Sequence, residues 1–317
     1  MPTAFGIDID SPAPPKLLAP ADALPTGRRM RLELAPIAGE SPRWPPGGRT
    51  ICVRRDRAGV ELFTIEEHAS AGYRIWGRGR GEYLLSADAS HLLCAPDGAS
   101  EPQWERFLVG QVLPFAALLS GLEIFHASAV ALGGRAIAFA GPSGAGKTSL
   151  ALALCRLGAG FLADDVIALE IASSSSAQDV QLLAHPGTPV AGVDRREDER
   201  LRLIGAALPA AGLGGDARER LLPMRGERAP VPLAALFFLD RCRDESRTEL
   251  SFEPVCGAPL LLAATFNFAL DSPKRMRGLL DVCALAARGR VERVVIPSSV
   301  DPGELGEAVR GRVEGEL

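Results

Sequence analysis

The sequence predicts an α/β domain preceded by a smaller, mainly β domain, and three observations favour this fold class. An apolar run at residues 136–140, a glycine-rich loop and a helical segment follow one another directly. The segment 234–239 is almost entirely apolar, as in a strand covered on both faces. Between residues 29 and 93, short alternating segments are separated by turn residues, which is typical of a β domain.

The domain boundaries follow from changes in composition. The length of 317 residues suits one large domain or two of ordinary size. Residues 1–28 are rich in proline and have no sustained period, so we expect a flexible lead or edge segment. The smaller domain is expected over residues 29–120 and the α/β domain over residues 121–317.

Composition and charge limit the class of protein. The formal net charge of -4 argues against nucleic acid or an acidic membrane surface as the main partner. Six cysteines are scattered singly, without the spacing of a zinc site. Residues 1–24 lack the pattern of a signal peptide, and polar residues interrupt the most apolar stretch, 107–131. We therefore expect a cytoplasmic protein that does not enter the membrane.

The secondary structure is expected in the following order. In the smaller domain, strands are predicted at residues 50–53, 61–65, 73–76 and 82–85, followed by a helix at 102–119. In the α/β domain, the predicted elements are strands 126–132 and 136–140 joined by a turn, a helix 148–157, one extended segment 161–170, a strand 180–184, helical pieces with mobile loops over 191–227, a strand 234–239, helices 258–268 and 273–288, and a strand 291–296.

The glycine-rich loop satisfies the pattern G-x-x-x-x-G-K-[ST]. Its glycines let backbone N–H groups converge on a phosphate, and the helix that follows presents its positive N-terminus to the same anion. Lys147 is expected to neutralise the terminal phosphates and the Thr148 hydroxyl to coordinate Mg²⁺. The predicted ligand is a nucleoside triphosphate, ATP with Mg²⁺. The residues expected to hold it are Gly141, Pro142, Ser143, Gly144, Ala145, Gly146, Lys147, Thr148 and Ser149.

Two adjacent carboxylates, Asp164 and Asp165, lie seventeen and eighteen residues after Lys147 inside an apolar segment. Burying such a pair is costly unless a cation is near. Neighbours on a strand point to opposite faces, so the pair suggests divided roles unless the chain bends. One carboxylate would orient or deprotonate an acceptor hydroxyl and the other would reach Mg²⁺. The alternative is a turn or a structural ion pair.

Two histidines and two arginines are further candidates. His126 begins the strand that pairs with the one leading into the loop, and it is either a hydrogen-bonded core residue or part of the site. His185 either lines the nucleotide pocket or lies in an exposed turn. Arg195 and Arg196 are candidates for stabilising charge on a transferring phosphoryl group, with a solvated surface as the alternative.

The residues from His126 through the loop Gly141–Thr148 to Ala163-Asp164-Asp165 resemble the catalytic core of HPr kinase/phosphorylase. That family has a histidine, a β-hairpin, a G-x-S-G-x-G-K-[ST] loop and an A-D-D strand in this order. The resemblance is tight over about 45 residues. Weaker similarity, at residues 184–189 and 232–239, is to diverged members that include kinases of lasso-peptide precursors. Phosphoenolpyruvate carboxykinase has a similar P-loop fold.

The resemblance implies a P-loop serine/threonine kinase that acts on a protein or peptide. It implies Asp164 as catalytic base, Asp165 with Thr148 on the Mg²⁺ side, and His126 and Lys147 as active-site residues. HPr kinases oligomerise, so it also allows a homo-oligomer. The family's glycine- and arginine-rich segment downstream of the acidic pair has no match here. We therefore expect a kinase without phosphorylase activity, whose acceptor is not HPr.

Two other readings of the loop and the acidic pair stay open. One is a kinase of a small-molecule hydroxyl. The other is a nucleotide-gated regulatory or binding module, although binding alone does not require the carboxylate pair.

Overall fold

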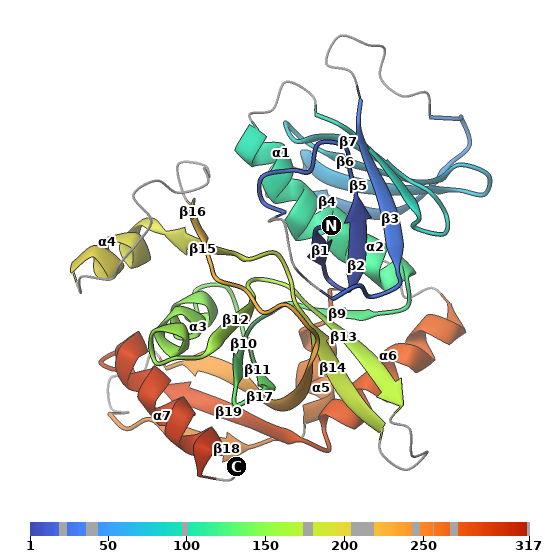
Figure 1. Ribbon diagram of the computed structural model, residues 1–317. Helices are drawn as coiled ribbons and strands as arrows, with labels where there is room; N and C mark the ends of the chain where they lie inside the picture. The colour runs from blue at the N-terminus through green and yellow to red at the C-terminus, as the bar shows by residue number, and fades with distance from the viewer. Residues whose placement is uncertain are drawn as a thin grey trace.

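The computed structural model describes residues 1–18, 24–35, 44–96, 101–173, 180–203, 219–242, 248–255, 257–266 and 272–315. It is a mixed α/β structure with two large sheets and a separate two-stranded hairpin (Figure 1). We call the part that contains β1–β8 and the helical segment after them the N-terminal unit. The part that begins with β9 is the C-terminal unit.

The N-terminal unit is built on an eight-stranded sheet in the order β1-β2-β3-β8-β7-β6-β5-β4. Its strands are β1 Thr3–Ala4, β2 Ile7–Asp10, β3 Arg29–Leu34, β4 Arg49–Arg55, β5 Glu61–His68, β6 Gly72–Gly77, β7 Gly81–Leu85 and β8 His91–Ala95. The pairs β2–β3 and β3–β8 are parallel, and the strands from β8 to β4 pair antiparallel. The mainly β composition expected for this part is therefore present.

Of the two alternatives for the N-terminal segment, residues 1–18 form the edge segment and not a flexible lead. Strands β1 and β2 lie at the edge of the first sheet, and Ile7 and Ile9 are at most 1% exposed. The Asp8 carboxylate accepts hydrogen bonds from the backbone N–H groups of Thr26 and Gly27, which ties the segment to the start of β3. The alternation Ile-Asp-Ile-Asp is too short to identify a strand among the surrounding prolines. Residues 19–23 lie outside the described part of the chain.

The helix expected at 102–119 is present, but it is divided by a turn of π-helix. It consists of α1 Glu101–Phe107, the π-helix η1 Leu108–Val112 and α2 Leu113–Leu119. Pro114 has no N–H to donate, and its ring conflicts with the carbonyl of the preceding turn in a regular α-helix. A wider turn before proline accommodates that conflict. The segment packs on the first sheet through Phe107, whose ring contacts Phe63 and Tyr83.

The C-terminal unit is built on a nine-stranded sheet. Seven of its strands have the order β12-β10-β11-β17-β14-β13-β9, while β19 pairs with β17 and β18 pairs with β19. The strands are β9 Glu123–Phe125, β10 Ala127–Leu132, β11 Arg135–Ala140, β12 Gly160–Ala163, β13 Ile167–Ser173, β14 Val180–His185, β17 Val231–Arg241, β18 Ser251–Pro254 and β19 Arg290–Ile296. Strands β11, β17 and β19 run parallel, so their carboxyl ends meet at one edge of the sheet.

Helices cover both faces of this sheet. Helices α3 Lys147–Arg156 and α7 Pro302–Glu314 pack over one face with Phe139 and Phe237. Helices α5 Gly257–Ala263 and α6 Pro273–Ala286 pack over the other, with Leu236 and Phe238 (Figure 1). Strand β17 is therefore buried from both sides, as its apolar sequence predicts.

Three parts of the C-terminal unit differ from the sequence expectation. The extended segment 161–170 is broken between β12 and β13, which lie far apart in the strand order. Within 191–227, the chain forms a two-stranded antiparallel pair of β15 Val190–Asp194 and β16 Glu219–Pro223 on either side of α4 Arg195–Leu203 in the sequence. The C-terminal helix α7 was not expected; Asp301 caps it by accepting from the N–H groups of Gly303 and Glu304. The end expected for the helix 258–268 lies outside the described residues.

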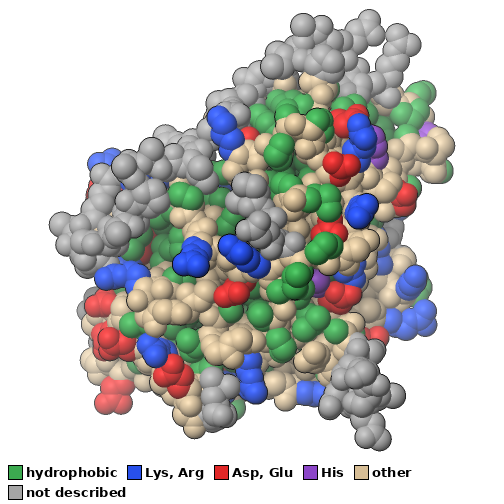
Figure 2. All heavy atoms as spheres, viewed as in Figure 1, with side chains coloured by type: hydrophobic (Ala, Val, Ile, Leu, Met, Phe, Trp, Pro, Cys, Tyr) green, Lys and Arg blue, Asp and Glu red, His purple; other side chains and the backbone are tan. Residues whose placement is uncertain are grey.

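Within the described part of the chain, no helix has the length and apolar character needed to cross a membrane. Figure 2 shows basic, acidic and apolar side chains interspersed over one face of the molecule.

Candidate active site

The glycine-rich loop joins β11 to α3 at the edge of the sheet where the parallel strands end. Gly141 has φ 146°, and a Cβ there would lie 2.6 Å from the carbonyl oxygen of Leu239 on the neighbouring strand. Gly146 has φ 98° and precedes the first turn of α3. Both positions therefore require glycine, one for close approach and one for a left-handed turn. The loop therefore has the strand–loop–helix setting that its pattern predicts.

Lys147 lies in the first turn of α3 and is only 8% exposed. Its Nζ donates to the carbonyl oxygens of Gly141, at 3.0 Å, and Pro142, at 3.3 Å. Burial lowers the pKa of Lys147, and the negative charges of Asp165 and Asp164 oppose that effect. The ammonium group is thus held over the loop, where the charges of both carboxylates act on it.

Asp164 accepts three hydrogen bonds. Its Oδ1 accepts from the hydroxyls of Ser128, at 2.6 Å, and Thr148, at 2.8 Å. Its Oδ2 accepts from the backbone N–H of Gly192 at 2.9 Å. Burial raises the pKa of Asp164, and the hydrogen bonds from Ser128 and Gly192 oppose this. The carboxylate is therefore fixed beside the hydroxyl that the loop pattern assigns to Mg²⁺.

The Asp165 side chain points away from the partners of Asp164 because the chain turns at this residue. Its φ of 69° is in the left-handed region, which is uncommon for residues other than glycine and is frequent at functional sites. The carboxylate is 3.4 Å from His126 Nδ1 and accepts from Arg106 Nη2 at 3.4 Å. The bend between β12 and β13 thus gives the two adjacent carboxylates separate partners.

His126 lies between β9 and β10, and its backbone N–H donates to the carbonyl of Ala264 at 2.7 Å. Its side chain is 40% exposed, so it is not the buried core histidine that the sequence left open. The ring stacks against Phe266 with centroids 6.4 Å apart. Among the described residues, its Nδ1 is buried without a hydrogen-bond partner, although Asp165 is close.

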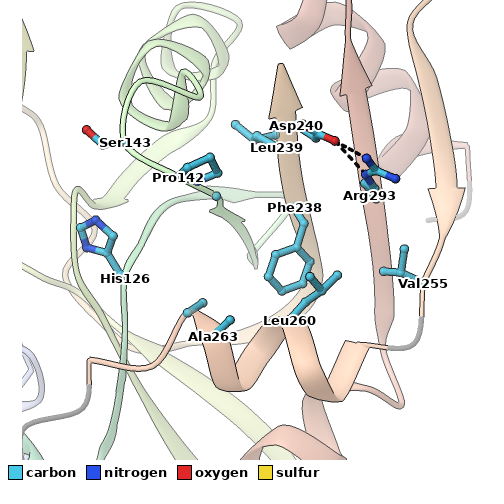
Figure 3. Close-up of a pocket in the computed structure, with 12 residues that line it drawn as sticks. His126, Pro142, Ser143, Phe238, Leu239, Asp240, Val255, Leu260, Ala263 and Arg293 are labelled. Carbon is cyan, nitrogen blue, oxygen red and sulfur yellow. Dashed lines mark hydrogen bonds and ion pairs between the residues drawn. The ribbon is translucent and has the colours of Figure 1, made fainter. Parts of the chain in front are cut away.

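A pocket of about 700 Å³ opens beside the first residues of the loop. His126 and Ser143 lie at one end, and the ion pair of Asp240 with Arg293 lies at the other (Figure 3). Apolar side chains from the sheet and from α5 form the rest of the wall: Phe238, Leu239, Val255, Leu260, Ala263 and Ala264. A mainly apolar pocket of this size with a few polar groups is typical of a ligand site.

The oxygen atoms at the end of the loop are of the type that Mg²⁺ binds. The Thr148 hydroxyl and the Asp164 carboxylate share a hydrogen bond, and hydroxyl and carboxylate oxygens are what Mg²⁺ prefers. Among the described residues, no group of three or more His, Cys, Asp or Glu side chains is arranged to hold a metal ion. Such a site would therefore rely on the nucleotide's phosphates and on water for the remaining ligands.

Other expected residues lie outside this arrangement. His185 is neither a pocket residue nor an exposed turn: it is 2% exposed, and its Nε2 is 2.7 Å from a carboxylate oxygen of Glu170. Arg195 is 88% exposed and pairs with Glu199 on α4, which matches the solvated alternative.

Four residues of the arrangement were missed from the sequence: Ser128, Gly192, Arg106 and Glu219. Ser128 could have been noticed as the one hydroxyl in the apolar strand β10, two residues after His126. The other three carry no local signal, since they come from α1 and from the β15–β16 hairpin.

Comparisons with solved structures add a distant likeness. No protein-family model matches the chain, and no curated protein matches it. Among solved structures, it is similar to the structure of the HPr(Ser) kinase/phosphatase from Coxiella burnetii, with 15% identity and a TM-score of 0.30. The match covers 62% of this chain and 99% of that chain. A TM-score this low does not establish a shared fold.

Proposed function

We propose that the protein transfers the terminal phosphoryl group of ATP to a serine or threonine hydroxyl of a protein or peptide. The observation that carries the proposal is the arrangement of the loop with the two carboxylates. Asp164 is bonded to Thr148 at the end of the loop, while Asp165 faces His126, which lines the pocket. A phosphate cradle alone indicates binding, whereas a second carboxylate beside an open pocket suits a reacting hydroxyl.

The loop N–H groups and Lys147 would bind and orient the triphosphate. Mg²⁺, when bound beside Thr148 and Asp164, would neutralise charge on the phosphate oxygens. Catalysis would come mainly from positioning and from stabilising charge, because phosphoryl transfer requires little covalent chemistry from the protein.

The hydrogen bonds favour a division of roles opposite to the one that the family resemblance implies. Asp164 is engaged by Thr148, Ser128 and Gly192, which suits the metal side. Asp165 is less enclosed, with its side chain 36% exposed, and it contacts the histidine at the pocket. We therefore propose Asp165 as the carboxylate that orients the acceptor hydroxyl and receives its proton, with His126 beside it.

The pocket supports an acceptor with an apolar side chain near the reacting hydroxyl. Its wall is apolar between His126 and the Asp240–Arg293 pair, so it would bury a hydrophobic residue of a peptide.

The test is transfer of ³²P from γ-labelled ATP to a library of peptides that carry serine or threonine, with matching alanine peptides as controls. Binding of a fluorescent ATP analogue is measured in parallel. We expect Mg²⁺-dependent binding and labelling of hydroxyl peptides, and loss of labelling in Asp165→Asn. Absence of nucleotide binding would refute the proposal. Binding without turnover on peptides or water would favour a regulatory module instead.

A further inference from the structure

Arg106 belongs to the N-terminal unit, but its guanidinium group lies in the C-terminal unit's site. Helix α1, which carries it, is fixed to the first sheet: the hydroxyl of Tyr83 donates to the carbonyl of Trp104 at 2.9 Å. From there, Arg106 Nε and Nη2 donate to the two carboxylate oxygens of Glu219 on β16, at 3.0 and 3.2 Å. Nη2 also donates to Asp165 Oδ2 at 3.4 Å.

The helix geometry leaves room for this side chain. Gly110, in the π-helical turn, faces the guanidinium: a Cβ there would lie 2.8 Å from Arg106 Nη1. The side chain is only 27% exposed. Burial disfavours its charged form, but the hydrogen bond and charge of Glu219 and the charges of Asp165 and Asp164 outweigh burial and raise the pKa of Arg106. The cation is therefore permanent.

The Arg106 guanidinium is also linked to Asp164, through Glu219 and Gly192. The Glu219 carboxylate lies directly over Gly192, since a Cβ on Gly192 would lie 2.0 Å from Glu219 Oε1. The N–H of Gly192 in turn donates to Asp164 Oδ2. One arginine thus contacts Asp165 directly and holds the hairpin that donates to Asp164.

We infer that Arg106 is a positioning residue of the proposed kinase site, so that the N-terminal unit completes the active site of the C-terminal unit. The inference rests on the proposed function. Two adjacent carboxylates and a triphosphate concentrate negative charge, and a fixed cation reduces their mutual repulsion. The planar fork of arginine bonds Glu219 through two separate nitrogens while it contacts Asp165, and lysine, whose donors all lie on one nitrogen, does not reproduce this bidentate geometry.

The structure provides a matched control. Arg28 also belongs to the N-terminal unit, is also 27% exposed, and pairs across the same boundary with Glu170 on β13. It contacts neither Asp164 nor Asp165. Arg28→Met therefore removes a boundary ion pair of the same kind without removing the cation at the carboxylates.

The experiment measures Mg²⁺-ATP hydrolysis, with water as surrogate acceptor, for wild type, Arg106→Met, Arg106→Lys and Arg28→Met. We expect Arg106→Met to lower kcat by about 100-fold, with KM for ATP changed less than about threefold. Arg106→Lys should recover part of kcat, and Arg28→Met should retain it within about twofold.

Other outcomes would contradict either the role of Arg106 or the proposed function. A wild-type kcat in Arg106→Met would overturn the inference, as would an equal loss of kcat in Arg28→Met, which would indicate a general effect of the boundary. If Arg106→Met does not fold, as judged by circular dichroism, Glu219→Gln replaces it. Wild-type turnover in that variant would equally overturn the inference. Absence of turnover and of peptide labelling by the wild type would instead refute the proposed function, and with it the role of Arg106.

Discussion

Replacing Asp164 by asparagine should separate the stability of the site from its activity. The carboxylate accepts from Ser128, Thr148 and the N–H of Gly192. An asparagine of the same shape can direct its oxygen to Gly192 and its NH₂ group to the two hydroxyls, which accept as well as donate. Asp164→Ala, by contrast, removes all three hydrogen bonds and should cost roughly 3 kcal/mol of unfolding free energy.

The ionised carboxylate itself lowers stability at neutral pH. Burial raises the pKa of Asp164 in the folded state. A carboxyl group whose pKa is raised by folding contributes its full stability at pH values below the pKa that it has in the unfolded chain. That contribution is lost as the pH rises through the pKa that it has in the folded protein. Asp164→Asn lacks the charge, so at pH 7 it should be at least as stable as the wild type. This advantage should disappear below about pH 4.

Activity should respond in the opposite direction. Loss of the carboxylate beside Thr148 should lower Mg²⁺-ATP turnover by at least about 100-fold and raise the Mg²⁺ concentration for half-maximal turnover by about tenfold. Urea unfolding at pH 4 and pH 7 measures stability, and a coupled assay of ADP release measures turnover. Asp164→Asn with turnover within a factor of ten of the wild type would refute the role of this carboxylate. An Asn variant as unstable as the Ala variant would refute the hydrogen-bond reasoning.

The remaining predictions concern three other positions. Asp165→Asn should lower turnover by about 10²–10⁴-fold with an unchanged Mg²⁺ requirement, as a Mg²⁺ titration of turnover would reveal; a tenfold change in that requirement would contradict the assignment. Gly141→Ala should weaken binding of a fluorescent ATP analogue and cost about 2 kcal/mol in urea unfolding, because its Cβ would meet the Leu239 carbonyl at 2.6 Å with φ at 146°. Burial raises the pKa of Glu123 to about 7, although the charge of Arg275 opposes this effect. The protonated side chain therefore stabilises the folded state, and this stabilisation is lost as the pH rises from about 4.5 to about 7. Glu123→Gln should therefore have the higher Tm at pH 8 and the same Tm as wild type at pH 4, and equal Tm values at pH 8 would contradict this.

The parts of the site that the sequence predicts are local. The loop and its flanking elements are read from consecutive residues, because the strand, the glycines and the helix follow one another between residues 135 and 156. The hairpin of β10 and β11 is predicted for the same reason, since a two-residue turn sets its register.

The parts that the sequence does not predict depend on contacts between distant segments. The direction of Asp165 follows from a bend that carries the chain from β12 to β13, and no neighbouring glycine or proline signals it. Arg106 is 59 residues from Asp165, so nothing in its own helix distinguishes it from a surface arginine. The edge strand β2 is stabilised by pairing with β3, and β1 by pairing with β2, rather than by their own length.

The left-handed backbone of Asp165 has a consequence for how this position tolerates change. Asparagine and glycine adopt this conformation most readily, whereas alanine or a β-branched residue would add strain of the order of 1 kcal/mol or more. Glycine would relieve the backbone while deleting the carboxylate. At this corner, backbone strain and the contacts of the carboxylate with Arg106 and His126 are therefore coupled, since a change that relieves the first removes the second.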